Sequence, residues 1–320
     1  MYRHSRLAAV LGCAATLAMV GCANSGVTPS MGSTAPQQLQ SHVPMGPDWI
    51  QQDGVLYHTP HYFATREAAS KQAKVNPDIL LNYGNGPVLV APKAYIIFWG
   101  YKTYGDADKV AKLLKSYAKN MGGSGHNNIY TQYYEIVSST TTYITNPKKQ
   151  LGGVWMDNTN AVPAHPSDAQ VAAEALNGVA KFGYDPNGSY VVATPHGHSS
   201  TGFGTQWCAY HSATFSSGKL VSYTNLPYMP DAGSSCGANF TTPPSDESAT
   251  DEGVTIVEGH EYGESVTDPN PPSGWYNGSE GEIGDICAWQ DIQNDPFGKK
   301  SYTSQPMFSN ATQSCVQSYP

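Results

Sequence analysis

The 320-residue sequence has little charge, since Asp, Glu, Lys and Arg together make up 13% of it. Basic side chains are the scarcer ones, with 17 Lys and Arg against 25 Asp and Glu and a formal net charge of −8. Proteins that bind nucleic acid usually carry a basic face or stripe. The composition therefore excludes nucleic acid as an expected partner, and it leaves few cations for neutralising buried carboxylates.

The motifs of several enzyme classes are missing as well. The sequence contains no phosphate-binding loop and no Ser/His/Asp nucleophile motif, and Thr201-Gly-Phe-Gly-Thr205 does not have the form of a nucleophile elbow. Cysteines at C-x-x-C spacing are absent, which argues against a zinc site made of four thiolates. No internal repeat is evident. These chemistries and architectures are therefore not expected.

The N-terminus lacks an apolar run long enough to span a bilayer. Basic residues precede the apolar stretch Leu7–Val20, which is too short for a membrane helix. This order is typical of a bacterial secretory signal, predicted over residues 1–21. Its ending, Met19-Val20-Gly21-Cys22, resembles a lipobox. We expect an exported protein lipidated at Cys22 and held to the membrane at the cell envelope, with secretion after cleavage nearby as the alternative.

The segment after the signal, residues 22–60, is predicted to be a flexible linker. Most of it is rich in Ser, Gly, Pro, Thr and Gln and has few apolar residues. The remainder, residues 61–320, is predicted to form a single domain. Tyr is abundant, with 21 in the sequence, and Tyr-rich surfaces bind sugars or peptides, although Tyr is equally a half-buried strand residue.

Six cysteines are present, and two of them, Cys13 and Cys22, lie in the signal region. An even number in the mature part of an exported protein favours disulfides. Three pairings are possible. We expect Cys208–Cys236 and Cys287–Cys315, because each bond closes a local loop.

Hydrophobic periodicity predicts an alternation of strands and helices. A capping box at Ser167–Gln170 marks the start of one helix. The predicted elements are strand 88–99, helix 110–121, strands 129–137 and 140–145, helix 168–182, strand 189–194, a hairpin or edge strand over 207–215 and 220–224, and a helix carrying His260 with its N-cap among residues 245–250.

This order is similar to that of the catalytic domain of zincin metallopeptidases. The predicted fold class is α+β. It has a zincin-like mixed sheet backed by two helices, then a metal-site helix, then an irregular disulfide-containing C-terminal part. Fold alone does not settle activity.

The segment Val257-Glu-Gly-His260-Glu261-Tyr-Gly-Glu264 has the form H-E-x-x-E. On a helix, residues four apart share a face, so His260 and Glu264 are predicted to bind one ion. Glu261 occupies the position of the general base in H-E-x-x-H zinc peptidases. The second ligand position holds Glu where those enzymes have His.

A third ligand is expected from the C-terminal part. Glu282, in Gly-Glu-Ile-Gly-Asp, is the first candidate, and Asp285 and Glu280 are its competitors. Asp268, four residues after Glu264, could be a ligand or a hydrogen-bond partner of a ligating imidazole. Burying several carboxylates without a cation costs several kcal/mol each, so a metal is expected here. His favours Zn²⁺, and the carboxylate-rich set keeps Ca²⁺ as the alternative.

Other histidines are weaker candidates. His211 is predicted to be catalytic, because its strand would flank the cleft, and it could orient substrate, ligate the ion, or simply pack. Either His211 or Tyr262 could stabilise an oxyanion. His196 and His198 are a possible chelating pair in a loop, but exposed histidines in a turn are commoner.

Three sets of segments together resemble the phosphate-induced protein 1/Exordium-like family. They are Gly84–Leu89 with Tyr95–Gly100, Gln206–His211 with Tyr223–Cys236, and Glu258–Pro269 with Gly274-Trp-Tyr and Asp285-Ile-Cys287. The resemblance implies a secreted or wall-associated protein but no reaction. This chain looks like a bacterial branch in which the metal constellation is present.

The sequence thus gives two hypotheses. The first is an exported zinc-dependent hydrolase, a metallopeptidase acting on a peptide or protein with Glu261 as general base. The second is a non-catalytic cell-envelope binding protein, with a structural calcium or zinc site and contacts to carbohydrate or protein.

Overall fold

The computed structural model describes residues 48–71, 79–241, 246–279 and 281–320. The predicted signal peptide and Cys22 lie outside these residues, as does Glu280. None of the described helices combines the length and the apolar character that crossing a membrane requires.

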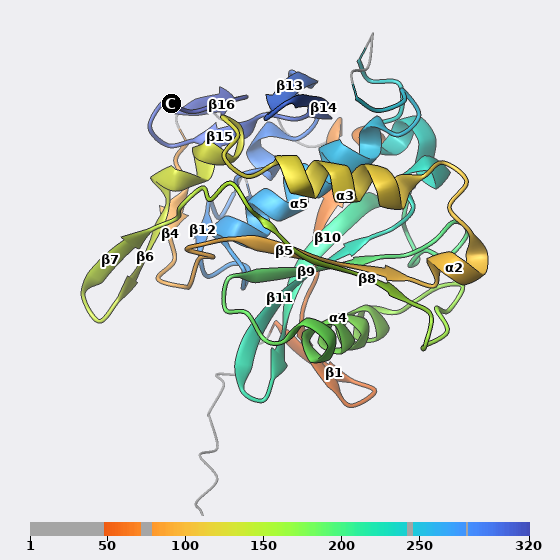
Figure 1. The fold of residues 1–320 in the computed structure, drawn as a ribbon. Helices are drawn as coiled ribbons and strands as arrows, with labels where there is room; N and C mark the ends of the chain where they lie inside the picture. Colours follow the sequence, from red (N-terminus) through yellow and green to blue (C-terminus); the bar gives the residue numbers. More distant parts are fainter. Residues whose placement is uncertain (1–47, 72–78, 242–245, 280) are drawn as a thin grey trace, which may run out of the picture. The chain divides into compact units, whose positions relative to one another are not determined.

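A mixed sheet of eight strands forms the centre of the fold (Figure 1). Its main path runs β1-β2-β10-β11-β9-β5-β8, and β3 pairs with β10. Neighbours among β8, β5, β9 and β11 are parallel, whereas β10 and the N-terminal strands pair antiparallel. The strands are β1 Trp49–Gln52, β2 Val55–His58, β3 His61–Ala64, β5 Lys93–Trp99, β8 Leu151–Asp157, β9 Gly188–Ala193, β10 Trp207–Ser216 and β11 Lys219–Leu226.

Helices cover both faces of this sheet (Figure 1). Helices α3 (Val110–Asn120) and α5 (Glu252–Thr267) lie on one face, and α4 (Asp168–Phe182) lies on the other. Alternation along β5 explains the division, because successive side chains of a strand point to opposite faces. Ile96 and Phe98 join the core with α3 and α5, whereas Ile97 and Trp99 join the core with α4.

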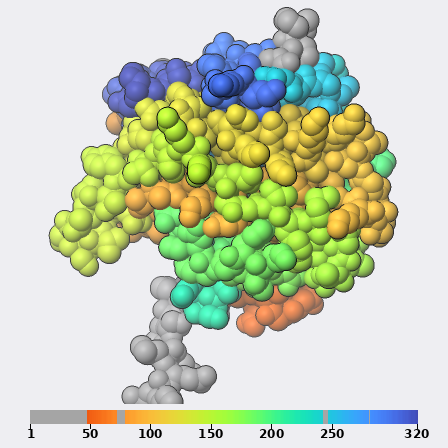
Figure 2. Space-filling model, in the orientation of Figure 1, coloured from red at the N-terminus to blue at the C-terminus, as the bar shows by residue number. Residues whose placement is uncertain are grey.

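Short elements complete the chain. The C-terminal part packs on the α3 and α5 side, where the Tyr302 ring lies 5.4 Å from the ring of Tyr117. Figure 2 shows the yellow surface of α3 next to the blue C-terminal segments. The short elements are α1 Arg66–Ala69, α2 Tyr101–Tyr104, β4 Asn82–Tyr83, β6 Tyr134–Val137, β7 Thr140–Tyr143, β12 Trp275–Tyr276, β13 Gln293–Phe297, β14 Lys300–Ser304, β15 Met307–Ser309, β16 Ser314–Val316, and the 3-10 helices η1 Asn127–Gln132, η2 Met229–Cys236 and η3 Asp285–Cys287.

The α+β class with a large mixed sheet and few helices is confirmed. So are the capping box of α4, the β10–β11 hairpin, and both expected disulfides, Cys208–Cys236 and Cys287–Cys315. The two helices ahead of the His260 helix lie on opposite faces of the sheet, so they do not back it together.

Three local predictions were wrong. Residues 129–132 belong to η1 rather than to a strand, because Ile129 and Tyr130 reach the core from a 3-10 turn. Strand β8 escaped prediction because it contains two glycines, which weaken a strand signal. A Cβ at Gly152 would lie 2.6 Å from the Tyr95 ring, so close packing requires the glycine. Asp251, not residues 245–250, is the N-cap of α5.

The predicted linker, residues 22–60, also extends too far. Strands β1 and β2 lie within it and pair with each other in the main sheet. Asp53 and Gly54 connect them with positive φ angles of 52° and 81°. An Asp-Gly pair between two apolar runs is a strong hairpin signal, because its tight turn needs positive φ at both positions.

Helix α5 is buried on every side, and all 16 of its residues are inaccessible. Glycines make this possible, since a Cβ at Gly259 would lie 2.7 Å from the Tyr117 hydroxyl and one at Gly263 would lie 3.0 Å from the Tyr130 hydroxyl. The His and Glu side chains of α5 are therefore carried into the interior of the protein, where charge is costly.

Candidate metal centre

Four parts of the chain meet at the α5 helix. Strands β3 and β10 contribute His61 and His211, which are directly opposite each other in the antiparallel register. Cross-strand partners of this kind project on the same face of a sheet. The segment after β12 contributes Glu282 and Asp285, and α5 contributes His260, Glu261 and Glu264.

One group, which we call the His211 cluster, consists of His61, His211, Glu264 and Glu282. Each residue offers a ligand atom, and these atoms lie within 4.8 Å of one another. The Nδ1 atom of His211 is 3.3 Å from Glu264 Oε2, and its Nε2 atom is 3.5 Å from Glu282 Oε2. The Nδ1 atom of His61 contacts Glu282. Two imidazoles and two carboxylates are a common donor set for a transition-metal ion.

The second group, which we call the His260 cluster, consists of His260, Glu264 and Asp285. His260 Nε2 lies 3.1 Å from Glu264 Oε1 and 3.7 Å from Asp285 Oδ1. The other ring nitrogen, Nδ1, lies 3.0 Å from Gln305 Nε2. Phe63 stacks on the imidazole, with ring centroids 3.6 Å apart. Glu264 thus belongs to both clusters.

Glu261 lies beside the His211 cluster. Its Oε2 atom is 3.4 Å from His211 Nδ1, and the side chain is fully buried. Burial raises the pKa of Glu261 to about 7, although His211 and His260 oppose the rise. A carboxyl group with such a pKa can exchange a proton near neutral pH.

The carboxylates in turn raise the pKa values of the neighbouring histidines. Burial by itself lowers the pKa of His211, but Glu282, Glu261 and Glu264 outweigh it and hold that pKa well above its ordinary value. Burial likewise lowers the pKa of His61, and Glu282 and Asp285 raise it to about 10. The carboxylates of this centre therefore attract positive charge strongly.

Many polar atoms here are buried without a hydrogen bond. They include both ring nitrogens of His211 and both carboxylate oxygens of Glu261 and of Glu282. Orphaned polar atoms at this density are unusual in a folded protein and call for an explanation, such as an ion. Among the described residues, no ion pair joins Lys or Arg to these carboxylates.

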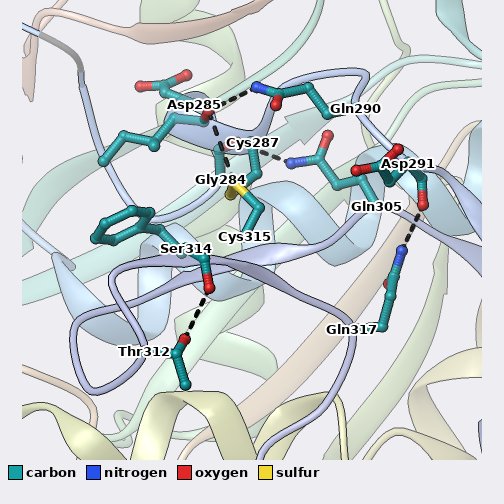
Figure 3. The surroundings of a disulfide bond; sticks show 12 residues. Gly284, Asp285, Cys287, Gln290, Asp291, Gln305, Thr312, Ser314, Cys315 and Gln317 are labelled. Carbon is teal, nitrogen blue, oxygen red and sulfur yellow. Dashed lines mark hydrogen bonds between the residues drawn. A yellow bond between two sulfur atoms is a disulfide. The ribbon is translucent and has the colours of Figure 1, made fainter. Parts of the chain in front are cut away.

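The loop that supplies Glu282 and Asp285 fits tightly on α5. A Cβ at Gly284 would lie 2.6 Å from His260 Nδ1, so this position must be glycine. The backbone N–H of Asp285 donates to Glu264 Oε1 at 3.1 Å. The Cys287–Cys315 disulfide follows two residues later, and Figure 3 shows it beside Gly284 and Asp285. The disulfide ties this loop to β16.

A cavity of about 430 Å³ reaches the centre from outside. His61 and Glu282 line it together with Pro271, Pro272 and Tyr276. The His61 side chain is 38% exposed, whereas those of His211 and Glu264 are 0% and 1% exposed. Small groups can therefore approach the centre from the His61 side.

Several predicted residues lie elsewhere. Asp268 belongs to neither cluster, and its Oδ1 atom accepts a hydrogen bond from the Gly274 N–H at 2.8 Å. Tyr262 donates its hydroxyl to Gln150 Oε1 at 3.0 Å. His196 contacts Asp231 at 2.5 Å, and His198 lies against Tyr104, so these two histidines do not converge on one ion.

The sequence prediction grouped His260, Glu264 and Glu282, but the structure divides them between two clusters that share Glu264. Glu282 lies with the two strand histidines, and Asp285 lies with His260. His61 was missed altogether. Its only sequence signal was its place after a hairpin with an Asp-Gly turn, and the pairing of β3 with β10 was not predictable from there. Gln305 was missed for the same reason, since it is distant in sequence.

Comparison with known proteins supports one resemblance. Over 236 residues the chain is 26% identical to Protein EXORDIUM-like 5 of Arabidopsis thaliana. The aligned part is 65% of this chain and 63% of that relative, so the chain spans less than two thirds of the relative's length. No family model and no solved structure matches the chain. The chain is thus similar to the Exordium-like proteins.

Proposed function

We propose that this protein is an exported, zinc-dependent hydrolase with its ion in the His211 cluster. The observation that carries the proposal is the convergence of two imidazoles and two carboxylates at the end of a cavity, where both ring nitrogens of His211 and both carboxylate oxygens of Glu282 are buried without hydrogen bonds. The ligands would come from His61, His211, Glu264 and Glu282, because a catalytic zinc uses three protein ligands and keeps a further position for water. Nitrogen donors favour zinc over calcium, which prefers oxygen ligands throughout.

The neighbouring residues suit a hydrolytic role. A zinc ion, when bound, supplies a water with a lowered pKa and polarises a carbonyl group. Glu261 is the expected general base, because its carboxylate is buried, adjacent to His211 and free of hydrogen bonds. His211 then serves as a ligand instead of an oxyanion donor. The cavity opens to the outside beside His61, and a peptide or protein is the proposed substrate.

Metal analysis is the first test. Protein purified without added metal should contain zinc, and chelation should abolish hydrolysis of a peptide pool. Glu261→Gln should retain zinc and lose activity by about 100-fold or more, the scale of general-base catalysis. Glu174→Gln, a buried helix carboxylate on the other face of the sheet, is the matched control and should remain active. Metal-free protein, or a fully active Glu261→Gln variant, would refute the proposal.

The second candidate is a cell-envelope binding protein with a structural zinc or calcium ion. Burial favours it, because His211 and Glu264 are almost completely inaccessible. Binding to cell-wall carbohydrate, stabilisation by calcium but not by zinc, and no hydrolysis of any peptide would favour this candidate.

Membrane anchoring remains a separate proposal. It depends on the lipobox ending at Cys22, in the part of the chain that is not described. Mass spectrometry of the mature N-terminus tests it, since a lipidated Cys22 and a simple cleavage product differ by the mass of the acyl chains.

A further inference from the structure

We infer that His260 is not a ligand of the ion but a positioning residue, which holds Glu264 so that its other oxygen faces the metal. The inference rests on the proposed zinc site in the His211 cluster. It reverses the role that the H-E-x-x-E pattern suggests, since in H-E-x-x-H enzymes the first His binds zinc through a ring nitrogen.

The Gln305 side chain determines which nitrogen of His260 carries the proton. Gln305 Nε2 donates to the carbonyl oxygen of Gly284 at 2.9 Å. A carbonyl only accepts hydrogen bonds, so this contact fixes the orientation of the amide. The same Nε2 atom lies 3.0 Å from His260 Nδ1, which must therefore act as the acceptor.

A neutral imidazole that accepts at Nδ1 carries its proton on Nε2. That N–H is 3.1 Å from Glu264 Oε1. A metal bound at Nε2 would require the opposite tautomer, in which Nδ1 carries the proton and donates it to a neighbouring acceptor. Gln305 presents a donor to Nδ1 instead. Stacking against Phe63 and the close approach of Gly284 leave the ring little freedom to turn.

The two carboxylate oxygens of Glu264 consequently have different surroundings. Its Oε1 atom faces His260 Nε2 and accepts from the Asp285 N–H at 3.1 Å. Its Oε2 atom faces His211 at 3.3 Å, toward the proposed ion. Ligating carboxylates are normally oriented by polar contacts of this kind, and removal of the partner typically weakens metal binding about 10- to 100-fold.

The test compares two substitutions of His260 in the full mature chain. His260→Gln places an amide N–H near the position of Nε2, whereas His260→Leu removes the donor. We expect one zinc per chain in the wild type and in His260→Gln, with zinc affinity weakened less than about 10-fold. His260→Leu should weaken it about 10- to 100-fold. His211→Gln, which removes a ligand, should weaken it more than either.

Two spectroscopic readouts are independent of activity. Long-range ¹H–¹⁵N NMR of the zinc-loaded protein should show the His260 proton on Nε2. Co²⁺-loaded His260→Gln should keep the visible spectrum of the wild type, and Co²⁺-loaded His211→Gln should not. Glu174→Gln, a buried carboxylate on the other face of the sheet, should behave as wild type.

A metal-bound Nε2, two ions per chain, or loss of zinc from His260→Gln as complete as from His211→Gln would overturn the inference. A wild type without any bound ion would overturn the proposed function as well. If zinc binds as described but no substrate is cleaved, only the catalytic proposal fails.

Discussion

On the α4 face of the sheet, Glu174 is buried beside Asp157; on the α5 face, Glu261, Glu264 and Glu282 are buried around His211. Burial raises the pKa of Glu174 to about 8, with the Asp157 carboxylate adding to the rise and the Asn177 amide opposing it. Glu174 is thus neutral at pH 7. Protonation of this one carboxyl group avoids the unfavourable burial of a charge on the α4 face.

On the α5 face, protonating one carboxyl group would leave the other buried carboxylates charged. Imidazoles surround them, and His260 and His211 lower the pKa of Glu264 against the effect of its burial. Buried acids alone therefore do not indicate a metal site. The proposed metal site rests instead on acids that face histidines, without nearby Lys or Arg among the described residues and with atoms left unpaired.

The sharpest way to test this contrast is to neutralise one acid on each face. Glu264→Gln removes a proposed ligand that also contacts both buried histidines, and we expect it to cost about 3–5 kcal/mol of unfolding free energy. Glu174→Gln keeps the volume and uncharged state that Glu174 already has at pH 7, so its effect should stay within about 0.5 kcal/mol. Urea unfolding of both variants with zinc present measures the difference. Equal effects would contradict the comparison.

Metal removal addresses the same contrast without any substitution. A ligand that binds only the folded state stabilises it by about 2.7 kcal/mol at a free concentration one hundred times its Kd. Zinc added to chelator-treated protein should therefore raise the melting temperature by about 5–10 °C for a domain of this size. Glu174→Gln should show the same rise, and Glu264→Gln should show little. An unchanged melting temperature in the wild type would count against a resident ion.

The extent of successful prediction follows from how local each signal is. The capping box at Ser167, the β10–β11 hairpin and the H-E-x-x-E helix are each encoded within a short stretch, and the structure contains all three elements. The α5 helix also brings His260 and Glu264 together, as helical spacing requires.

The composition of the site depended on pairings that no local pattern contains. His61 meets His211 only because β3 adds to β10, across about 150 residues of sequence. The roles of Glu282 and Asp285 were likewise open, because a glycine-rich loop has no periodicity from which to predict side-chain direction. The helix alone suggested a zincin-like ligand set with His260. Strands β3 and β10 instead place His61 and His211 beside Glu264 and Glu282.

The pH dependence of stability tests whether a single proton neutralises Glu174 on the α4 face. The folded-state pKa of Glu174 is about 8, above its ordinary value of 4.5. As pH rises, Glu174 therefore loses its proton in the unfolded chain before it does so in the folded protein. Between these two pKa values, each further pH unit lowers the unfolding free energy. Between about pH 5 and 8 the unfolding free energy of the wild type should fall by about 3–4 kcal/mol relative to Glu174→Gln, which cannot ionise. Urea unfolding in chelator across this range isolates the effect, because the α5 acids titrate alike in both proteins. A flat difference, or one that rises with pH, would mean that Glu174 is charged in the folded protein and that the α4 face needs a cation too.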